Sequence, residues 1–531
     1  MALAAAVLAS ACGGGGGGDS YAPGTDLPAS DATAVHFLTQ ATFGADDASI
    51  ARLHRLGYST WLREQMEMGA SLHRPELEAR AGAGENIQQI HRQEMWWRRA
   101  VVAPDQLRQR VAFALSQIFV ISDRASALNT DSIGMAEYYD ILVRNAFGNY
   151  RELIEQITLS PQMGKYLSML RNRKPDLARN IKPDENYARE IMQLFSIGLV
   201  QLDQQGNVVR DGSNQPIPTY TQEEIVGLAH VFTGWTYAGS TSFFSATPNY
   251  RPMEPFEDYH DQQAKNVLGG VIFPAGRTAR EELTDFLDRL AAHPNVAPFL
   301  AKQLIQRLVT SNPTPAYVGR IAAVWNDNGA SVRGDLGAVV RAILLDAEAM
   351  TGQIAAPTTF GKLREPLLRL SALWRAFHAR ADDGLYDYTN PEINMAQAAL
   401  RSETVFNFYR PDHQPQGELA TASLVAPEFE ILTHSTITTQ TNQLYTSVNR
   451  HRSAAGTAPD QILIDLQREI AMAADPVALV DHLNVLLLAG TMSVEMHAIL
   501  VAHLQAETDL KTRAEDAVHL VVTSPEFAIQ K

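Results

Sequence analysis

Cysteine is almost absent from this chain of 531 residues, in which Cys12 is the only example. A single thiol cannot form an internal disulfide, and zinc sites built from several cysteines are excluded. The chain also lacks any uninterrupted run of about 18 apolar residues, so we expect no membrane-spanning helix. Cys12 is the one position at which the sequence predicts attachment to a membrane.

Basic residues are fewer than acidic ones, with 44 Lys and Arg against 59 Asp and Glu and a formal net charge of −15. A chain this acidic is repelled by phosphate backbones, which argues against nucleic acid as a partner. The same balance argues against binding an anionic membrane surface through basic patches. A local basic pocket remains compatible with these totals.

Several motifs that mark cofactor and nucleophile sites are missing. The sequence contains no His-x-x-x-His or His-Glu-x-x-His pattern, no Walker loop and no glycine-rich dinucleotide fingerprint after a strand. It also lacks the Gly-x-Ser-x-Gly turn of many serine hydrolases. The segment Asn326-Asp327-Asn328-Gly329 lacks the glutamate that closes a calcium loop, so we interpret it as a turn. We therefore predict no nucleotide, no metal and no cofactor.

The N-terminus resembles a lipoprotein signal. An apolar run from Ala2 to Ala9 precedes Cys12, and six glycines follow it. In such signals the cysteine is acylated and becomes the new N-terminus, and Gly13 after it favours the outer membrane. Position −3 is Ala9 rather than the commoner leucine. No basic residue precedes the apolar run, and this second departure suggests a start codon further upstream. The alternatives are an ordinary secretory signal or a tail without function.

The remaining composition is that of a globular protein, with 45% apolar and 19% charged residues. We divide the chain into a signal with its lipobox (1–12), a glycine-rich tether (13–31) and a single large helical domain (32–531). Residues 380–390 are the candidate seam within that domain. The predicted fold is all-α, with one or two small β-hairpins in insertions.

Helical spacing of apolar residues predicts most of the elements. A first amphipathic helix opens at Val35, and capping residues mark several starts, including Ser160-Pro161, Thr221 and Asp335. The further predicted helices span 53–66, 95–100, 107–121, 135–147, 150–159, 185–199, 223–232, 280–292, 296–309, 316–326, 336–345, 359–379, 429–448, 461–473, 477–488, 494–504 and 510–522. Residues 200–220 read as an extended hairpin and 267–273 as a short strand. A long insertion without helical period covers 238–260.

One series of motifs is specific. It begins with Phe37-Leu38-Thr39-Gln40-Ala41-Thr42-Phe43-Gly44 and continues with Pro183-Asp184-Glu185-Asn186-Tyr187-Ala188-Arg189-Glu190, Phe232-Thr233-Gly234-Trp235 and His260-Asp261 with Lys265. Later segments are Lys362-Leu363-Arg364-Glu365-Pro366, Val405-Phe406-Asn407-Phe408-Tyr409 and Pro427-Glu428-Phe429. In this order they resemble the bacterial family filed as "domain of unknown function 1800". The resemblance implies an exported helical protein and no established activity.

The helix predicted at 185–199 carries the first candidate site. Glu185 and Arg189 are i,i+4 neighbours, as are Asn186 and Glu190. Under a catalytic hypothesis Glu185 or Glu190 is the acid or base, Arg189 clamps an anion, and Asn186 and Tyr187 bind substrate on a cleft wall. Under the alternative the same residues form salt bridges that brace a helix and contribute little.

His260, Asp261 and Lys265 form the second candidate site. A histidine titrates near neutrality and can act as acid, base or metal ligand. Adjacent strand residues point to opposite faces, so Asp261 need not orient His260. The alternative is a loop histidine bonded to backbone, followed by an aspartate that starts a turn.

Aromatic residues add candidate binding positions. Trp235 and Tyr259 lie next to these motifs, and Phe243, Phe244, Tyr250 and Phe256 share the long insertion. Exposed aromatics on a loop can stack on a sugar or peptide. They can equally form a satellite cluster that covers their own loop.

Two functions from different classes remain open. The first is an exported enzyme, a hydrolase or lyase, that acts on a polymer such as a polysaccharide outside the cytoplasm. The second is a non-enzymatic envelope scaffold or binding protein that works with a co-exported partner. They differ in whether the two motifs converge on an open cleft or are sealed in mutual salt bridges.

Overall fold

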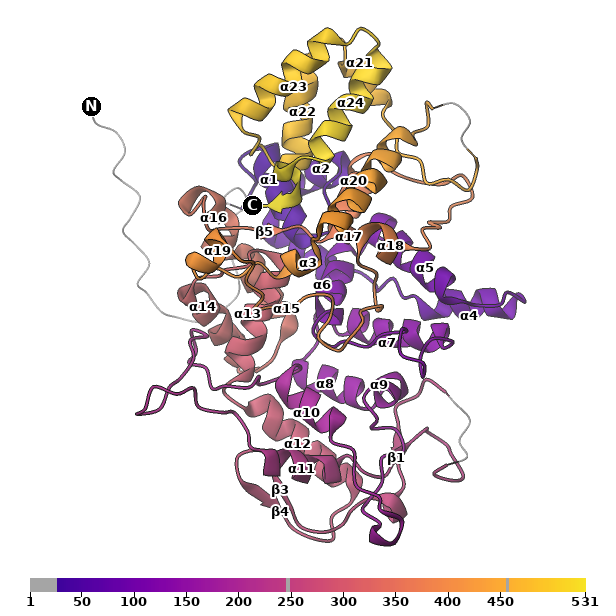
Figure 1. Ribbon diagram of the computed structural model, residues 1–531, viewed down its shortest axis with the longest axis vertical. Helices are drawn as coiled ribbons and strands as arrows, with labels where there is room; N and C mark the ends of the chain where they lie inside the picture. Colours follow the sequence, from indigo (N-terminus) through magenta and orange to yellow (C-terminus); the bar gives the residue numbers. More distant parts are fainter. Residues whose placement is uncertain (1–25, 245–248, 455–457) are drawn as a thin grey trace.

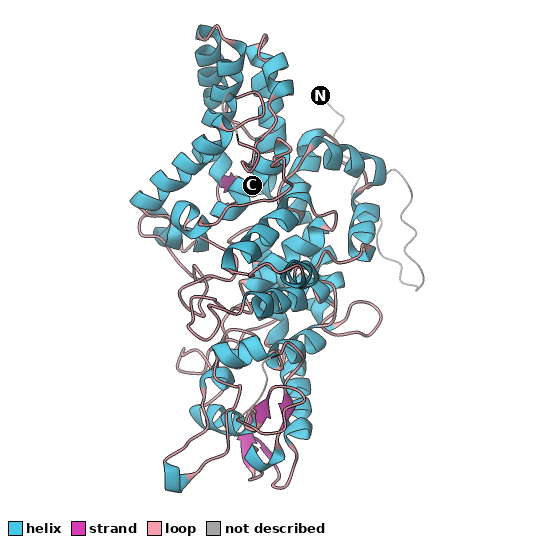
Figure 2. Cartoon of the chain, turned by 90° about the vertical axis from the view of Figure 1, so that its right-hand side faces the viewer, coloured by secondary structure: helices cyan, strands magenta, loops and turns pink. Residues whose placement is uncertain are grey.

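The computed structural model describes residues 26–244, 249–454 and 458–531. The molecule is elongated, with the C-terminal helices at one end and the segment around residues 222–292 at the other (Figure 1). Helices dominate the view at right angles as well, and the strands of the described residues form only two-stranded sheets (Figure 2). The predicted all-α fold with small hairpins is confirmed.

The N-terminal part folds as a succession of short helices. They are α1 (Asp31–Ala41), α2 (Asp47–Leu56), α3 (Tyr58–Glu67), α4 (Arg74–Gly82), α5 (Gln89–Val102), α6 (Gln106–Ser116), α7 (Ser132–Arg144), α8 (Tyr150–Thr158) and α9 (Pro161–Tyr166). The single helix predicted over 53–66 is wrong, because the chain breaks between α2 and α3. Gly57 makes the break with a φ of +76°, a conformation that favours glycine.

The central part continues the pattern around predicted caps. Its elements are the 3-10 turn η1 (Leu177–Arg179), α10 (Asn186–Gln193), α11 (Gln222–Val231), η2 (Glu257–Tyr259), α12 (Ala279–Ala292), α13 (Val296–Leu308), α14 (Pro315–Asn326), α15 (Leu336–Leu345) and α16 (Ala347–Ala355). Thr221 and Glu224 form a capping box on α11, and Asp335 caps α15 through the Ala338 N–H. Both caps were predicted, because the sequence places a cap residue directly before each apolar period.

Helix α10 is shorter than predicted, because the chain turns tightly after Gln193 instead of continuing to Leu199. The N–H groups of Ile197 and Gly198 both donate to the Met192 carbonyl at 3.0 Å. Gly198 has a φ of +69°, as expected of the glycine that ends a helix.

The C-terminal part contains α17 (Pro366–Ala376), α18 (Pro391–Met395), α19 (Glu418–Thr421), η3 (Pro427–Ile431), α20 (His434–Asn449), α21 (Gln467–Met472), α22 (Pro476–Leu488), α23 (Val494–Ala506), α24 (Leu510–Val522) and α25 (Pro525–Ala528). The helix predicted over 359–379 begins only at Pro366, a residue suited to the first turn of a helix. The helix predicted over 461–473 begins only at Gln467, because Leu463 forms a backbone bridge with Arg380.

The three sheets formed by the described residues are antiparallel pairs. They are β1 (Trp235–Thr236) with β2 (Glu254–Pro255), β3 (Lys265–Val267) with β4 (Val271–Phe273), and β5 (Lys362–Leu363) with β6 (Ile529–Gln530). The single strand predicted over 267–273 is instead part of a hairpin that turns at Gly269 and Gly270. The hairpin predicted over 200–220 is present only as isolated bridges, such as the one between Leu202 and Val208.

One hydrophobic cluster runs from Ala34 in α1 to Phe527 in α25. Helix α1 packs against α22, and α17 packs against α5, so residues far apart in sequence share one core. None of the helices in the described ranges has both the length and the apolar character needed to cross a bilayer. Where α17 packs on α5, the C-terminal end of α17 lies beside α2. A pocket opens between them.

Candidate functional site

The first residues of the predicted acidic motif lie on the surface, where Glu185 links α10 to α11. Glu185 occupies the N-cap position of α10 and forms an ion pair with Arg189 at 3.0 Å, and both side chains are more than one-third exposed. Gln222 at the start of α11 donates to the same Glu185 carboxylate at 2.9 Å. Asn186 is exposed beside them. An exposed i,i+4 pair of this kind adds little to stability.

Glu190 has different surroundings, because it is 7% exposed and its carboxyl forms no hydrogen bond or ion pair with a described residue. Burial raises the pKa of Glu190, and the nearby charge of Arg189 only partly opposes this. Tyr166 and Tyr220 lie near it, and burial followed by the Glu190 charge raises the pKa of Tyr166 to about 12. The Tyr220 hydroxyl is buried and has no hydrogen-bond partner in the described part of the chain. A carboxyl with a raised pKa keeps its proton to a higher pH than a free carboxyl, which suits a proton donor.

Tyr187 lies in the core and not on a cleft wall. It is 1% exposed, its ring packs edge-on against Phe232, and its hydroxyl lies 2.6 Å from the Thr158 hydroxyl. Burial raises the pKa of the Tyr187 phenol, and the bond to Thr158 opposes that shift. Trp235 is likewise completely buried, on β1.

His260 and Lys265 meet on one carboxylate, that of Glu282 in α12. The Nε2 atom of His260 lies 3.2 Å from one Glu282 oxygen, and the Lys265 Nζ lies 2.8 Å from the other. His260 and Glu282 are 0% exposed and Lys265 is 4% exposed. The second ring nitrogen of His260 lies 3.0 Å from the Thr233 carbonyl. These groups are thus sealed together inside the protein.

Sequence reasoning missed Glu282, although a signal was present. Glu282 lies on the same face of α12 as Ala279, Leu283 and Phe286, all of which are buried. An acid on the apolar face of a helix requires a buried cationic or hydrogen-bonding partner.

Asp261 pairs with His230 of α11. Burial alone would raise the pKa of Asp261. The hydrogen bonds from His230 and from the Gln263 N–H outweigh burial and lower this pKa to about 2. The pair therefore joins α11 to the segment before β3.

Tyr259 and its neighbours in the long insertion pack on one another. The Tyr259 ring stacks on Phe243 with centroids 4.1 Å apart, and Phe244 meets Tyr259 edge-on at 5.4 Å. Such a cluster covers its own loop. Cys12, the predicted lipidation site, lies outside the described residues.

Among five well-formed pockets on the described part of the chain, the largest lies elsewhere, and none of the five is lined by a predicted site residue. It has a volume of about 640 Å³, in the range of small-molecule sites. We call it the arginine pocket. Its walls come from α2, α3, the junction of α5 and α6, and the end of α17; polar lining residues include Thr42, Asp46, Ser49, Arg52, Arg55, Gln65, Gln106, Arg375, His378, Arg380 and Tyr386.

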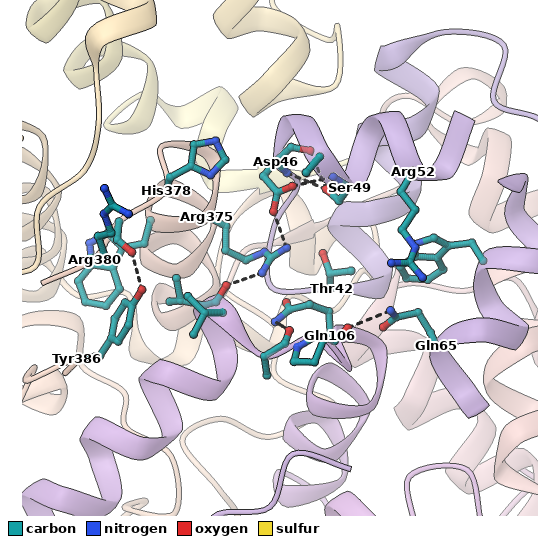
Figure 3. Close-up of a pocket in the computed structure, with 18 of the residues that line it drawn as sticks. Thr42, Asp46, Ser49, Arg52, Gln65, Gln106, Arg375, His378, Arg380 and Tyr386 are labelled. Atoms are coloured by element: carbon teal, nitrogen blue, oxygen red, sulfur yellow. Dashed lines mark hydrogen bonds and ion pairs between the residues drawn. The ribbon is translucent and has the colours of Figure 1, made fainter. Parts of the chain in front are cut away.

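An ion pair fixes the floor of this pocket. Figure 3 shows Arg375 beside Asp46, between Arg52 on one side and His378 and Arg380 on the other. Arg375 reaches Asp46 at 2.9 Å and donates to the carbonyls of Gly44 and Val101. Its donors are therefore used within the protein.

The rim is where positive charge remains free. Arg52 pairs with Glu64 at 2.6 Å, whereas Arg55 and Arg380 are exposed and their side chains have no partner among the described residues. His378 is also exposed. Four arginines line the pocket against one aspartate, in a chain with a net charge of −15. The arrangement can hold an anion.

Carboxylates and metal ligands are sparse by comparison. Asp46 is the only acid lining the pocket, so it holds no pair of carboxyls for glycoside hydrolysis. Within residues 26–244, 249–454 and 458–531, no group of three or more His, Cys, Asp or Glu side chains lies close enough together to hold a metal ion.

Comparison with known proteins gives one match. The profile of a family described as "Protein of unknown function (DUF1800)" matches residues 36–529. No curated protein and no solved structure matches the chain. The family that the motifs resemble is therefore confirmed over almost the whole described chain.

Proposed function

Since the chain belongs to the DUF1800 family of proteins of unknown function, we propose that it is an exported, lipid-anchored envelope protein that binds an anionic ligand in the arginine pocket. The observation that carries the binding function is the unpaired positive charge of Arg55 and Arg380 at the rim of a large pocket. Arginine forms charge-assisted, bidentate hydrogen bonds to carboxylates and phosphates.

The export part of the proposal is supported by the sequence around Cys12. An apolar run precedes this only cysteine, and glycines follow it. Replacing Cys12→Ala should remove labelled palmitate from the protein and move it from the membrane fraction to the soluble fraction. Unchanged membrane attachment of the variant would contradict a lipid anchor at Cys12.

Binding, rather than catalysis, is favoured by the sealed state of the second predicted motif. His260 and Lys265 both contact the Glu282 carboxylate inside the protein, where no polymer reaches them. Their roles are then structural. The contacts of His260 and Lys265 with Glu282 join α12 to the hairpin of β3 and β4.

Isothermal titration of the full chain with glucuronate and with inorganic phosphate tests the proposal. We expect Arg55→Gln and Arg380→Gln each to weaken binding by about tenfold, which is about 1.4 kcal/mol. Rising salt should weaken binding to the wild type as well, since exposed charges are screened. Arg63→Gln is the matched control, because Arg63 is an exposed arginine on α3 outside the pocket. Absence of binding, or equal binding by the double variant, would overturn the proposal.

A second function, acid catalysis on a polymer, is favoured by one observation. Glu190 is a buried carboxyl with a raised pKa and no partner among the described residues, as a general acid requires. Release of reducing ends from hyaluronan should then fall by about 100-fold or more in Glu190→Gln. The exposed Glu185→Gln should retain this activity. Equal rates in the two variants would rule Glu190 out as the acid.

A further inference from the structure

A second pocket adjoins the arginine pocket. It has a volume of about 220 Å³ and is lined by Trp374, Asp387, Tyr388, Gln443, Thr446, Ser447, Arg450, Asp460, Gln461 and Ile462. We call it the Asp387 pocket. It lies where α17 and α20 meet the segments around 387 and 461.

The two pockets share a wall of aromatic rings. Trp374 lines both, Tyr386 lines the arginine pocket, and Tyr388 lines the Asp387 pocket. The Trp374 ring lies 6.3 Å from Tyr386 and 5.8 Å from Tyr388, measured between centroids. Asp387, between the two tyrosines, is exposed. Residues 386–388 thus pass from the lining of the first pocket to the lining of the second.

The pockets differ in charge. Four arginines and one aspartate line the first, whereas two aspartates and one arginine line the second. An anion that is attracted to the first pocket is repelled by Asp387 and Asp460 in the second. Consecutive units of one ligand thus meet opposite electrostatic surroundings.

The Asp387 pocket also offers free donors and acceptors. The side chains of Asp387, Thr446, Arg450 and Asp460 form no hydrogen bond or ion pair with any described residue, and Gln443 and Ser447 bond weakly to each other at 3.2 Å. Hydroxyl groups both donate and accept hydrogen bonds, so a neutral, hydroxyl-rich group suits this set of side chains.

We propose that the two pockets bind successive units of an acidic polysaccharide in which a uronate alternates with a neutral sugar. The uronate carboxylate lies between Arg55 and Arg380, and the neutral sugar occupies the Asp387 pocket. This inference rests on the proposed function of the arginine pocket and names its ligand class. When two linked units bind, the second contact is intramolecular, and the overall affinity for the polysaccharide exceeds that for a single unit.

Titration of the full chain with three probes tests this inference. The probes are glucuronate, a hyaluronan hexasaccharide (alternating glucuronate and a neutral amino sugar), and a hexamer of galacturonate. We expect the hyaluronan hexasaccharide to bind at least tenfold more tightly than glucuronate, and the galacturonate hexamer to gain less than threefold. Removing the repulsion with Asp387→Asn and Asp460→Asn should give the galacturonate hexamer its own tenfold gain.

Two further variants separate the pockets. Thr446→Val with Arg450→Gln should remove the gain of the hyaluronan hexasaccharide and leave glucuronate binding unchanged. Asp383→Asn, on the same loop and outside both pockets, is the control and should change neither. If glucuronate binds but the hexasaccharide binds no more tightly, the two-pocket inference is overturned and the arginine pocket stands. If neither glucuronate nor inorganic phosphate binds, the proposed function fails together with it.

Discussion

Glu190 is a carboxyl whose ionised form the protein does not stabilise. Burial raises its pKa above the ordinary value of 4.5, and no described residue donates a hydrogen bond to it. A carboxyl with a raised folded-state pKa stabilises the fold below its unfolded-state pKa and loses that contribution as pH rises through the folded-state value. At neutral pH the charge on Glu190 is therefore a cost to folding.

Glu190→Gln should consequently raise Tm at pH 7 by about 1–2 °C, as expected for a small gain in a large protein. The gain should shrink as pH falls below about 4.5, where Glu190 is neutral in either state. Melting curves from pH 4 to 8 measure both effects. A fall in Tm at pH 7 would contradict this, because it would show that the ionised Glu190 side chain stabilises the fold through a contact within the protein.

The Asp261–His230 pair has the opposite pH dependence. The pKa of Asp261 is lowered to about 2, so its contribution to stability is present above about pH 4 and is lost as pH falls toward 2. His230→Ala should reduce the free energy of unfolding by about 1.5–3 kcal/mol at pH 7, as for a hydrogen bond to a charged group. The difference from wild type should shrink below pH 4.

Urea unfolding at several pH values measures this loss. His503→Ala is the control, because His503 pairs with Asp516 on the surface, where the two side chains are 50% and 38% exposed. A loss in His503→Ala as large as that in His230→Ala would contradict the role of burial.

At the scale of elements, α11 and β3 pack so closely that one side chain decides the contact. A Cβ added at Gly227 of α11 would lie 1.7 Å from the Asn266 carbonyl oxygen of β3. Gly227→Ala must push the hairpin away and should cost about 1–3 kcal/mol, as overpacking does. The matched change Gly82→Ala in α4 meets nothing within 4 Å and should gain about 0.5–1 kcal/mol. Thermal denaturation compares the two, and equal effects would contradict the close packing.

Most helices could be predicted because their signals are local. Thr221 with Glu224, and Asp335, lie directly before the residues that they cap. The starts of the helices predicted over 359–379 and 461–473 failed because they depend on distant residues. The segment before Pro366 forms a strand because it pairs with Ile529 and Gln530, more than 160 positions away along the chain. No periodicity within residues 359–379 reports that pairing.

At the scale of the whole molecule, the candidate site was hidden for the same reason. Asp46 pairs with Arg375 at the floor of the arginine pocket, and Arg55 and Arg380 both line it. Tertiary packing, such as that of α1 on α22 and of α17 on α5, brings these segments together. The net charge of −15 left room for a local basic pocket, but it gave no position. The predicted motifs were visible because each lies within a few consecutive residues.

The uneven distribution of charge is the central feature of this account. An acidic body repels anions at long range, while the arginine pocket attracts them at short range, so binding should be selective for anions that fit the pocket. The most direct test is to locate a bound anion. Crystals of the full chain soaked in selenate give the position of the anion from the anomalous scattering of selenium. We predict a peak between the Arg55 and Arg380 guanidinium groups that is lost in the double variant Arg55→Gln, Arg380→Gln. Selenate bound only at other surface arginines, with none in the arginine pocket, would contradict the account.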